Sequence, residues 1–250
     1  MDDGKQGTIR QCITDRMKRK LDNVTLIGID CVDIERLILA AEICLKNFEF
    51  GDVKLLSSID SNHPNFLKIE KLESVEDYSI FCTKKLDDFI ETKFALIFQH
   101  DGFILNPDAW DDIFLNYDYV GAPWLVNDWA IKNFGVPEEL RDTTLVGNGG
   151  FNLRSKKLIR EIKEMDLESN FKRYQPEDIV ICVDKRKELE DKGITFAPPE
   201  IAEKFSFEAI NEVNNKWTDQ FGFHGLRWTD ISKWLNENPE FKNKIDNTLE

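Results

Sequence analysis

The chain has 250 residues, of which 41% are hydrophobic, and this composition is typical of a globular protein with one large domain or two small ones. Its 33 basic and 47 acidic side chains give a formal net charge of −14, which opposes general binding to nucleic acids. Five cysteines, an odd number without a CxxC pair, argue against a disulfide framework and against a structural zinc site.

The first half of the chain alternates expected strands with expected helices. Residues 24–29 (VTLIGI) are β-branched and uncharged, which favours a short buried strand. Apolar side chains then recur 3, 4, 7 and 11 positions after Ile34, which is the spacing of one face of an amphipathic helix. Residues 53–59 (VKLLSSI) and 94–98 (FALIF) are further expected strands. A strand–helix–strand unit of this length predicts parallel strands joined by a right-handed crossover.

The second half of the chain is more mixed. Residues 151–155 (FNLRS) favour a strand that leads into a Lys-rich helix. Pro176 is expected to open a helix over roughly 177–191, and residues 194–198 and 204–208 have the composition of short strands. The pattern predicts one α/β domain over residues 23–235, built on an open, mainly parallel sheet flanked by helices.

Polar segments at the two ends complete the expected organisation. Residues 1–22 are expected to form a polar N-terminal extension and residues 236–250 a polar C-terminal tail. Ligands of an open α/β sheet bind outside the carboxyl ends of its strands. Asp30, residues 57–60 and residues 99–101 each follow an expected strand, so we expect them to share one crevice.

The segment Gln99-His100-Asp101-Gly102 follows its buried strand without a break. The Asp101 carboxylate is a hard oxygen ligand that suits Mg²⁺ or Mn²⁺, and either cation neutralises phosphate. Gly102 permits a tight turn and the close approach of a ligand. An ordinary Asp-Gly turn has the same sequence, so the residues alone leave both interpretations open.

Three later segments could complete a site. The glycines of residues 147–150 let a ligand approach the backbone closely, and Asn148 can hydrogen-bond a hydroxyl, although no Lys follows at the spacing of a phosphate loop. Glu177 or Asp178, at a helix start, could act as a general base or could simply favour the helix dipole. His224 lies between glycines in an aromatic segment, either as a core histidine or as a residue that faces a ligand.

Taken in order, these segments resemble the DUF5672 family of glycosyltransferase-like proteins. The resemblance is carried by QHDGF, VGNGGFNLRS, PEDI and FGFHG, together with YDYVGAPW and GITFAPPEIAEKFSFE, and it covers roughly residues 24–228. It implies a single GT-A-like glycosyltransferase domain, with a nucleotide-sugar donor bound on a Rossmann-like sheet.

The resemblance also implies roles on the donor side. QHD stands where GT-A enzymes carry an Asp-x-Asp metal motif: Asp101 matches the second acid, Gln99 replaces the first by a neutral amide, and His100 lies between them. His224 resembles the late histidine that completes such a metal site, which implies Mn²⁺ or Mg²⁺, with the imidazole favouring Mn²⁺. Asp30 stands where the nucleobase or ribose is held, and a UDP-sugar is the favoured donor.

On the acceptor side, Asn148, Gly149 and Gly150 resemble the glycine-rich segment under the donor sugar and acceptor. Glu177 and Asp178 resemble the acidic segment that supplies the base in inverting enzymes. Side chains of adjacent helical residues point about 100° apart, so only one of the two can face the crevice well, and Asp178 is favoured.

The sequence therefore predicts a glycosyltransferase that moves a sugar from a nucleotide-sugar to a glycan or another hydroxyl acceptor, with inversion and with a divalent cation. The neutral Gln99 argues against strict metal dependence, and it keeps open a non-catalytic carbohydrate- or nucleotide-binding module on the same fold. A nucleotidyltransferase or a sugar-nucleotide hydrolase would use the same crevice. The chain shows no apolar signal-peptide core and no apolar run near the roughly 20 residues of a membrane span, which predicts a cytoplasmic protein with no integral membrane segment.

Overall fold

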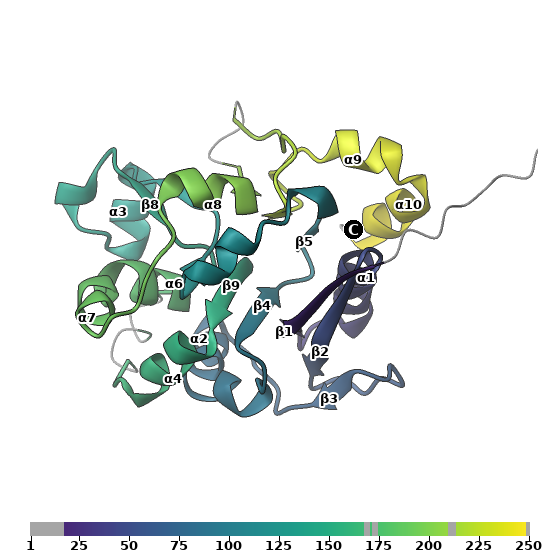
Figure 1. Cartoon of the computed structure of the whole chain (residues 1–250), viewed down its shortest axis with the longest axis horizontal. Coiled ribbons are helices and arrows are strands. Elements are labelled where there is room, and N and C mark those ends of the chain that lie inside the picture. Colours follow the sequence, from purple (N-terminus) through teal and green to yellow (C-terminus); the bar gives the residue numbers. More distant parts are fainter. Residues whose placement is uncertain (1–17, 168–170, 172–174, 210–213, 249–250) are drawn as a thin grey trace, which may run out of the picture.

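The computed structural model describes residues 18–167, 171, 175–209 and 214–248, and its centre is a six-stranded sheet (Figure 1). In spatial order the strands are β3 (Phe66–Lys68), β2 (Phe48–Ser57), β1 (Arg19–Ile29), β4 (Phe94–Phe98), β9 (Phe151–Ser155) and β6 (Tyr119–Val120). The first four strands run parallel, whereas β9 is antiparallel to both β4 and β6. The prediction that β1, β2 and β4 are neighbours in a mainly parallel sheet is confirmed.

Helices cover both faces of the sheet because successive strand side chains point to opposite sides. The covering helices are α1 (Ile34–Leu45), α2 (Val75–Lys84) and α4 (Lys156–Glu164). Leu26 and Leu96 lie in the same apolar cluster as Leu37 of α1. Ile27 and Ile97 instead belong to the cluster that α2 and α4 complete. The core therefore has three layers, and the ends of the central strands are left open.

A second, three-stranded sheet brings the late part of the chain to the end of β4. Its strands are β10 (Ser206–Glu208), β11 (Gly222–His224) and β5 (Gly102–Ile104), in that order. β11 pairs antiparallel with β5, which sets His224 opposite Gly102. Since β5 directly follows the Gln99-His100-Asp101 turn, this pairing carries His224 to that turn.

A third unit flanks the sheet on the side of β9. It consists of the hairpin β7 (Pro123–Leu125) and β8 (Thr144–Val146), with α3 (Asp128–Phe134) between the two strands. The helix that the sequence predicts after Pro176 is divided into α6 (Glu177–Ile179), a π turn (Val180–Asp184) and α7 (Arg186–Asp191). Ala130 of α3 and Ile179 of α6 are buried in one cluster, so these two helices lie side by side (Figure 1).

The two ends of the domain differ from the sequence prediction. β1 begins at Arg19, so the strand takes in part of the segment expected to be an extension, while residues 1–17 lie outside the described residues. Within the expected polar tail, residues 236–237 end α9 (Ser232–Glu237), and the residues that follow form α10 (Pro239–Thr248). Phe241 and Ile245 of α10 are buried in the main core. These two apolar residues, four apart, form a helical stripe that the polar composition of the segment conceals.

Two of the expected short strands need correction, and two further observations complete the fold. The segment 194–198 forms only an isolated bridge between Phe196 and Tyr119, and residues 199–205 form α8 (Pro199–Phe205) rather than the start of a strand. Short 3₁₀ turns occur at Leu86–Phe89, Pro107–Ala109, Asp112–Asn116 and Glu138–Leu140. Among the described residues, no helix has the length and apolar character needed to cross a membrane.

Candidate active site

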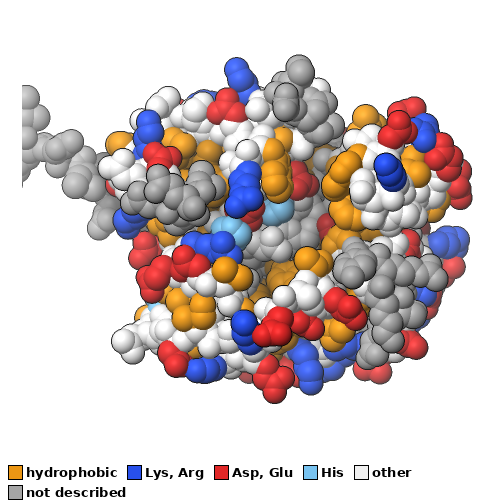
Figure 2. Space-filling view, turned by 180° about the vertical axis from the view of Figure 1, so that it is seen from behind, with side chains coloured by type: hydrophobic (Ala, Val, Ile, Leu, Met, Phe, Trp, Pro, Cys, Tyr) orange, Lys and Arg blue, Asp and Glu red, His pale blue; other side chains and the backbone are white. Residues whose placement is uncertain are grey.

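A cleft of about 1390 Å³ opens at the carboxyl ends of β1 and β4. Figure 2 shows a hollow in which histidine, basic and apolar side chains meet. Residues 57–60, which were expected to share this crevice, do not line it, because the chain after β2 continues to the edge strand β3, where Asp60 pairs with Lys68. The cleft is lined by all but one of the residues to which the family resemblance gives a role, namely Asp30, Gln99, His100, Asn148, Gly149, Gly150, Glu177, Asp178 and His224. The exception is Asp101, which contacts His224 from beside the cleft.

The two residues proposed as metal ligands converge. His224 Nε2 lies 3.4 Å from Asp101 Oδ1 and 3.3 Å from Gln99 Oε1. Asp101 Oδ1 is buried and forms no hydrogen bond with any residue that the structure describes. The Gln99 backbone N–H donates to the Gly150 carbonyl at 2.8 Å, which fixes the start of this turn against the glycine segment.

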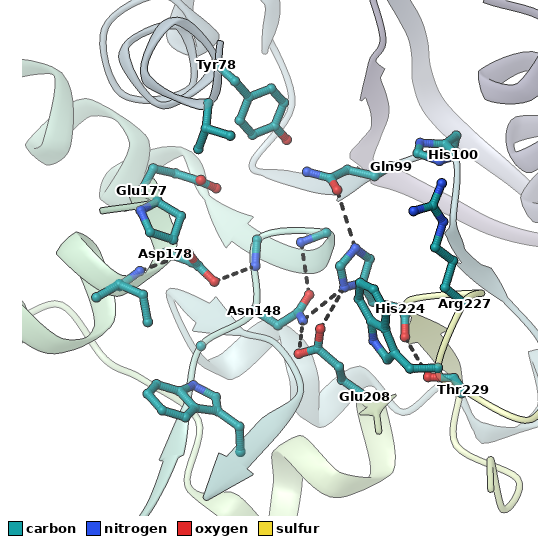
Figure 3. A pocket seen from close by; sticks show the side chains of 18 of the residues that line it. Tyr78, Gln99, His100, Asn148, Glu177, Asp178, Glu208, His224, Arg227 and Thr229 are labelled. Carbon is teal, nitrogen blue, oxygen red and sulfur yellow. Dashed lines mark hydrogen bonds and ion pairs between the residues drawn. The ribbon is translucent and has the colours of Figure 1, made fainter. Parts of the chain in front are cut away.

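Glu208, which was not selected from the sequence, contacts the Nδ1 side of the His224 ring. His224 Nδ1 lies 3.0 Å from Glu208 Oε1, and Asn148 Nδ2 donates to Glu208 Oε2 at 2.5 Å (Figure 3). A carboxylate on Nδ1 orients the ring and leaves Nε2 directed at Asp101 and Gln99. The only sequence signal for Glu208 was its place at the end of an expected strand.

These contacts determine the charges at this end of the cleft. Burial alone would lower the pKa of His224, but the contacts with Asp101 and Glu208 outweigh it and raise that pKa to about 10. Burial would raise the pKa of Asp101, yet the nearby His224 and His100 lower it to about 2. Burial lowers the pKa of His100. At neutral pH, His224 is therefore a cation held between two carboxylates.

The side chains of Asp101, His224 and Gln99 can be compared with the ligands that a divalent cation requires. The described residues contain no group of three or more His, Cys, Asp or Glu side chains arranged to hold a metal ion. The buried Oδ1 of Asp101, which forms no hydrogen bond with a described residue, nevertheless faces Nε2 of His224, and the carbonyl oxygen of Gln99 is the third neighbouring donor. Two oxygens and one imidazole nitrogen fit Mn²⁺ when oxygens of a bound phosphate supply the remaining ligands and the cation displaces the Nε2 proton that His224 carries at neutral pH.

The floor of the cleft requires glycine because neighbouring side chains pack directly against its backbone. A left-handed backbone conformation is not the reason. None of the three glycines among residues 147–150 has a positive φ. A Cβ on Gly150 would lie 2.0 Å from the His224 ring, and a Cβ on Gly149 would lie 2.9 Å from Glu177 Oε1. Asn148 holds the loop by accepting the backbone N–H groups of Gly150 and Phe151. Packing against His224 and Glu177 therefore requires these glycines, and the close approach of a ligand to the loop stays a prediction.

Glu177 and Asp178 are neighbours at the start of α6 but have different environments. Glu177 is 2% exposed, and its Oε1 accepts from Arg154 Nη2 at 2.8 Å. Arg154 is itself 1% exposed and donates from Nε to Asn152 Oδ1 at 2.8 Å. Asp178 is only partly buried, and its Oδ2 accepts from the Gly149 N–H at 3.0 Å. Glu177 is therefore committed to a buried ion pair, whereas Asp178 faces the cleft (Figure 3).

The environment of Asp178 favours its neutral form. Burial, followed by the negative charges of Glu177 and Glu208, raises the pKa of Asp178 to about 7. A carboxyl group with a pKa near the working pH is suited to accept and release a proton.

Asp30 has structural partners that the sequence did not indicate. Its carboxylate accepts from Arg36 Nε at 2.6 Å and from the backbone N–H groups of Val32 and Asp33 at 2.8 and 3.0 Å. His100 Nδ1 lies 3.6 Å away. Asp30 thus lines the cleft while it orders the start of α1, and it presents Arg36 as a basic group at the same edge.

Several other lining residues were missed from the sequence. Arg227 is exposed and forms no ion pair with any residue that the structure describes, and Trp228 beside it is 49% exposed. Trp124 and Trp129 line the opposite part of the cleft. An isolated Arg or Trp on a surface loop has no distinctive spacing, so no sequence pattern pointed to them.

Comparison with protein families gives a match over more than half of the chain. The model of the family described as "Protein of unknown function (DUF5672)" matches residues 63–224. No curated protein matches the sequence.

Solved structures give further similarities, all at low identity. An active-site mutant of LgtC is 14% identical, with a TM-score of 0.50, and the match covers 86% of this chain and 95% of that one. The galactosyltransferase LgtC in complex with donor and acceptor sugar analogues is 13% identical, with a TM-score of 0.48 and coverages of 81% and 87%. The similarity to the LgtC mutant shows that the chain has a GT-A fold.

Two longer proteins are also similar. The mannosyltransferase PcManGT from Pyrobaculum calidifontis, in complex with GDP-Man and Mn²⁺, is 9% identical, with a TM-score of 0.40, and 72% of this chain matches 55% of that one. The bifunctional IspDF from Campylobacter jejuni is 13% identical, with a TM-score of 0.39 and coverages of 72% and 51%. The chain spans about half the length of each.

Proposed function

The chain belongs to the DUF5672 family, and we propose that it is a glycosyltransferase that moves a sugar from a nucleotide-sugar donor to a hydroxyl acceptor, with inversion and with a divalent cation. The observation that carries this proposal is one cleft with two chemically different ends. Asp101, His224 and Arg227 lie at or beside one end, and Asp178 lies across the glycine floor (Figure 3).

The first end suits a diphosphate leaving group. Arg227 supplies an exposed guanidinium that forms no ion pair with any described residue, and a guanidinium can bind two phosphate oxygens at once. Without a metal ion, His224 carries a positive charge that the contacts with Glu208 and Asp101 stabilise, and its Nε2 proton must leave before that nitrogen can hold a metal ion. A Mn²⁺ or Mg²⁺ ion held by Asp101, Gln99 and His224 would neutralise charge on the departing diphosphate. Because Gln99 is neutral, we expect cation binding to be weak until the nucleotide is present.

The second end suits activation of the acceptor. Asp178 accepts the proton of the acceptor hydroxyl while the hydroxyl oxygen forms its bond to the anomeric carbon. The bond from that carbon to the diphosphate breaks at the same time, and its electron pair leaves with the nucleoside diphosphate. A single displacement of this kind inverts the anomeric configuration. Since the pKa of Asp178 is about 7, we expect kcat/KM to rise with pH through neutrality.

The experiment is product analysis with matched variants. The protein is incubated with UDP-, GDP- and CMP-sugars, Mn²⁺ and a mixture of hydroxyl acceptors, and proton NMR gives the anomeric configuration of the product. Asp178→Asn keeps the shape of the side chain and is expected to lower the transfer rate by about 10²–10⁴-fold with nucleotide affinity retained. Loss of transfer in Glu177→Gln instead would move the role to Glu177, and a product of retained configuration would contradict inversion.

The role of the cation has a separate test. Calorimetry measures the affinity for UDP, GDP and CMP in the presence of Mn²⁺ and of a chelator. We expect the chelator and Asp101→Ala each to weaken nucleotide binding. If neither changes the affinity, Asp101 and His224 do not hold a cation with the diphosphate, and His224 instead contacts phosphate directly.

A further inference from the structure

An aromatic wall lines the part of the cleft to which the proposed function gives no role. It consists of Trp124, which belongs to β7, and Trp129 and Phe134 of α3. Trp129 is 61% exposed, although its ring is held edge-on by Phe134 with 4.9 Å between centroids and 86° between planes. The cleft is therefore bordered by an indole that packs edge-on against Phe134 and has most of its surface in water. Such a surface favours contact with an apolar ligand face.

This wall packs against, and hydrogen-bonds to, the segment that contains Asp178. Ala130 of α3 is buried in one cluster with Ile179, the residue after Asp178. The Gln175 side chain, three residues before Asp178, donates from Nε2 to the Phe134 carbonyl at 2.8 Å. The wall thus belongs to the carboxylate end of the cleft. Figure 3 shows Glu177 and Asp178 at that end, across Asn148 from His224 and Arg227.

The wall also presents a polar group without a partner. Nε1 of Trp124 is buried and forms no hydrogen bond with any described residue. It lies beside the glycine floor, where a Cβ on Gly147 would be 3.7 Å from this nitrogen. A buried donor left unpaired costs free energy, so this N–H favours a ligand that brings an oxygen to it.

We propose that Trp129 and Trp124 form the acceptor subsite and that the acceptor is a saccharide. A sugar ring has an apolar C–H face that can stack on an indole and a rim of oxygens that can accept from Trp124 Nε1–H and present a hydroxyl to Asp178. A lipid would meet the carboxylates of Glu177 and Asp178 at the same place, and burial of hydrocarbon against them is unfavourable. This inference rests on the proposed function, because it assumes that the phosphates of the donor occupy the opposite end.

Equilibrium binding tests the subsite without any turnover. Saturation-transfer NMR is recorded with lactose, maltose, cellobiose and the p-nitrophenyl glycosides of glucose and galactose, in the presence of UDP, GDP or CMP. The proteins are the wild type, Trp129→Ala, Trp129→Phe and Leu67→Ala. Leu67 is a matched control because it is an exposed apolar residue on β3, 38% exposed, that does not line the cleft.

We expect at least one saccharide to bind the wild type. Its affinity should fall about tenfold or more in Trp129→Ala, recover largely in Trp129→Phe and stay unchanged in Leu67→Ala. The affinity for the nucleotide, measured by calorimetry, serves as the check that each variant is folded.

Two results would overturn the inference. These are the absence of saccharide binding in the wild type, and binding that Trp129→Ala leaves unchanged. Transfer to a serine peptide or to a long-chain alcohol but to no saccharide would assign the wall to another acceptor. Failure of the proposed function has a different signature: no nucleotide binds and no nucleotide-sugar is consumed, whatever the saccharide result.

Discussion

Replacement of Asp178 by Asn should make the protein more stable at alkaline pH while it removes activity. Burial and the charges of Glu177 and Glu208 raise the pKa of Asp178 to about 7. A carboxyl whose pKa is raised by folding binds its proton more tightly in the folded state than in the unfolded state. The wild type therefore loses stability as the pH rises from the unfolded pKa, about 4, to the folded pKa, about 7. Asn carries no charge and escapes this loss.

The magnitude follows from the two pKa values. An increase from the ordinary 3.8 to about 7 corresponds to roughly 4 kcal/mol, since each tenfold change in proton affinity is worth about 1.4 kcal/mol. Asn can accept only one of the two backbone N–H groups, from Gly149 and Ile179, that the carboxylate accepts, and this loss costs about 1–2 kcal/mol. The net gain of the variant is then about 2 kcal/mol at pH 8. At pH 5 the net gain of the variant is close to zero, because the wild type has then lost only about a third of the roughly 4 kcal/mol that it loses at high pH.

Urea unfolding at pH 5 and pH 8 measures this difference. A gain of about 2 kcal/mol should also raise the thermal midpoint at pH 8 by about 4–8 °C for a domain of this size. The matched control is Glu139→Gln, which removes one exposed negative charge from the same half of the chain and should change little. If Asp178→Asn is equally or less stable than the wild type at both pH values, Asp178 does not have a raised pKa, and the argument for its role as base is refuted.

Three other substitutions have defined outcomes. Arg154→Met leaves Glu177 buried without its partner and should lower the free energy of unfolding by about 3–5 kcal/mol in urea, with partial recovery when Glu177→Leu is added. Gly150→Ala places a methyl group 2.0 Å from the His224 ring, so calorimetry should show weaker nucleotide binding; unchanged affinity would mean that His224 does not contact the nucleotide. Arg227→Gln should weaken UDP, GDP and CMP binding by about tenfold and reduce its salt dependence, whereas an equal loss of affinity for uridine would exclude a phosphate contact.

The parts of the fold that could be predicted are those determined by residues close together in the sequence. The strands that became β1, β2 and β4 are short apolar runs, and their parallel order follows from the helix between the first two. The ends of such strands meet at one edge, which is why Asp30 and the Gln99–Asp101 turn line or adjoin the same cleft. The convergence of His224 on this turn could not be deduced from spacing. It depends on the pairing of β11 with β5, and only the family resemblance suggested it.

The parts that could not be predicted depend on tertiary partners. Arg154 occupies a strand position where an apolar residue is expected, and its burial is possible only because Glu177 and Asn152 pair with it. Glu177 and Asp178 are adjacent acidic residues at the start of one helix, so the sequence alone does not tell their roles apart. Glu177 is the buried, paired carboxyl and Asp178 the cleft-facing one because Arg154 forms its ion pair with Glu177. The helix α10 was missed because its two buried apolar residues are outnumbered by polar ones.

The most direct test of the central claim is the release of nucleoside diphosphate from a nucleotide-sugar, measured with and without saccharide, in the wild type and in Asp178→Asn. The account predicts release that is stimulated by saccharide and that falls by about 10²–10⁴-fold in the variant. Tight nucleotide or saccharide binding without any release would contradict it and indicate a binding module. Formation of nucleoside triphosphate and sugar 1-phosphate on addition of pyrophosphate would instead identify a nucleotidyltransferase.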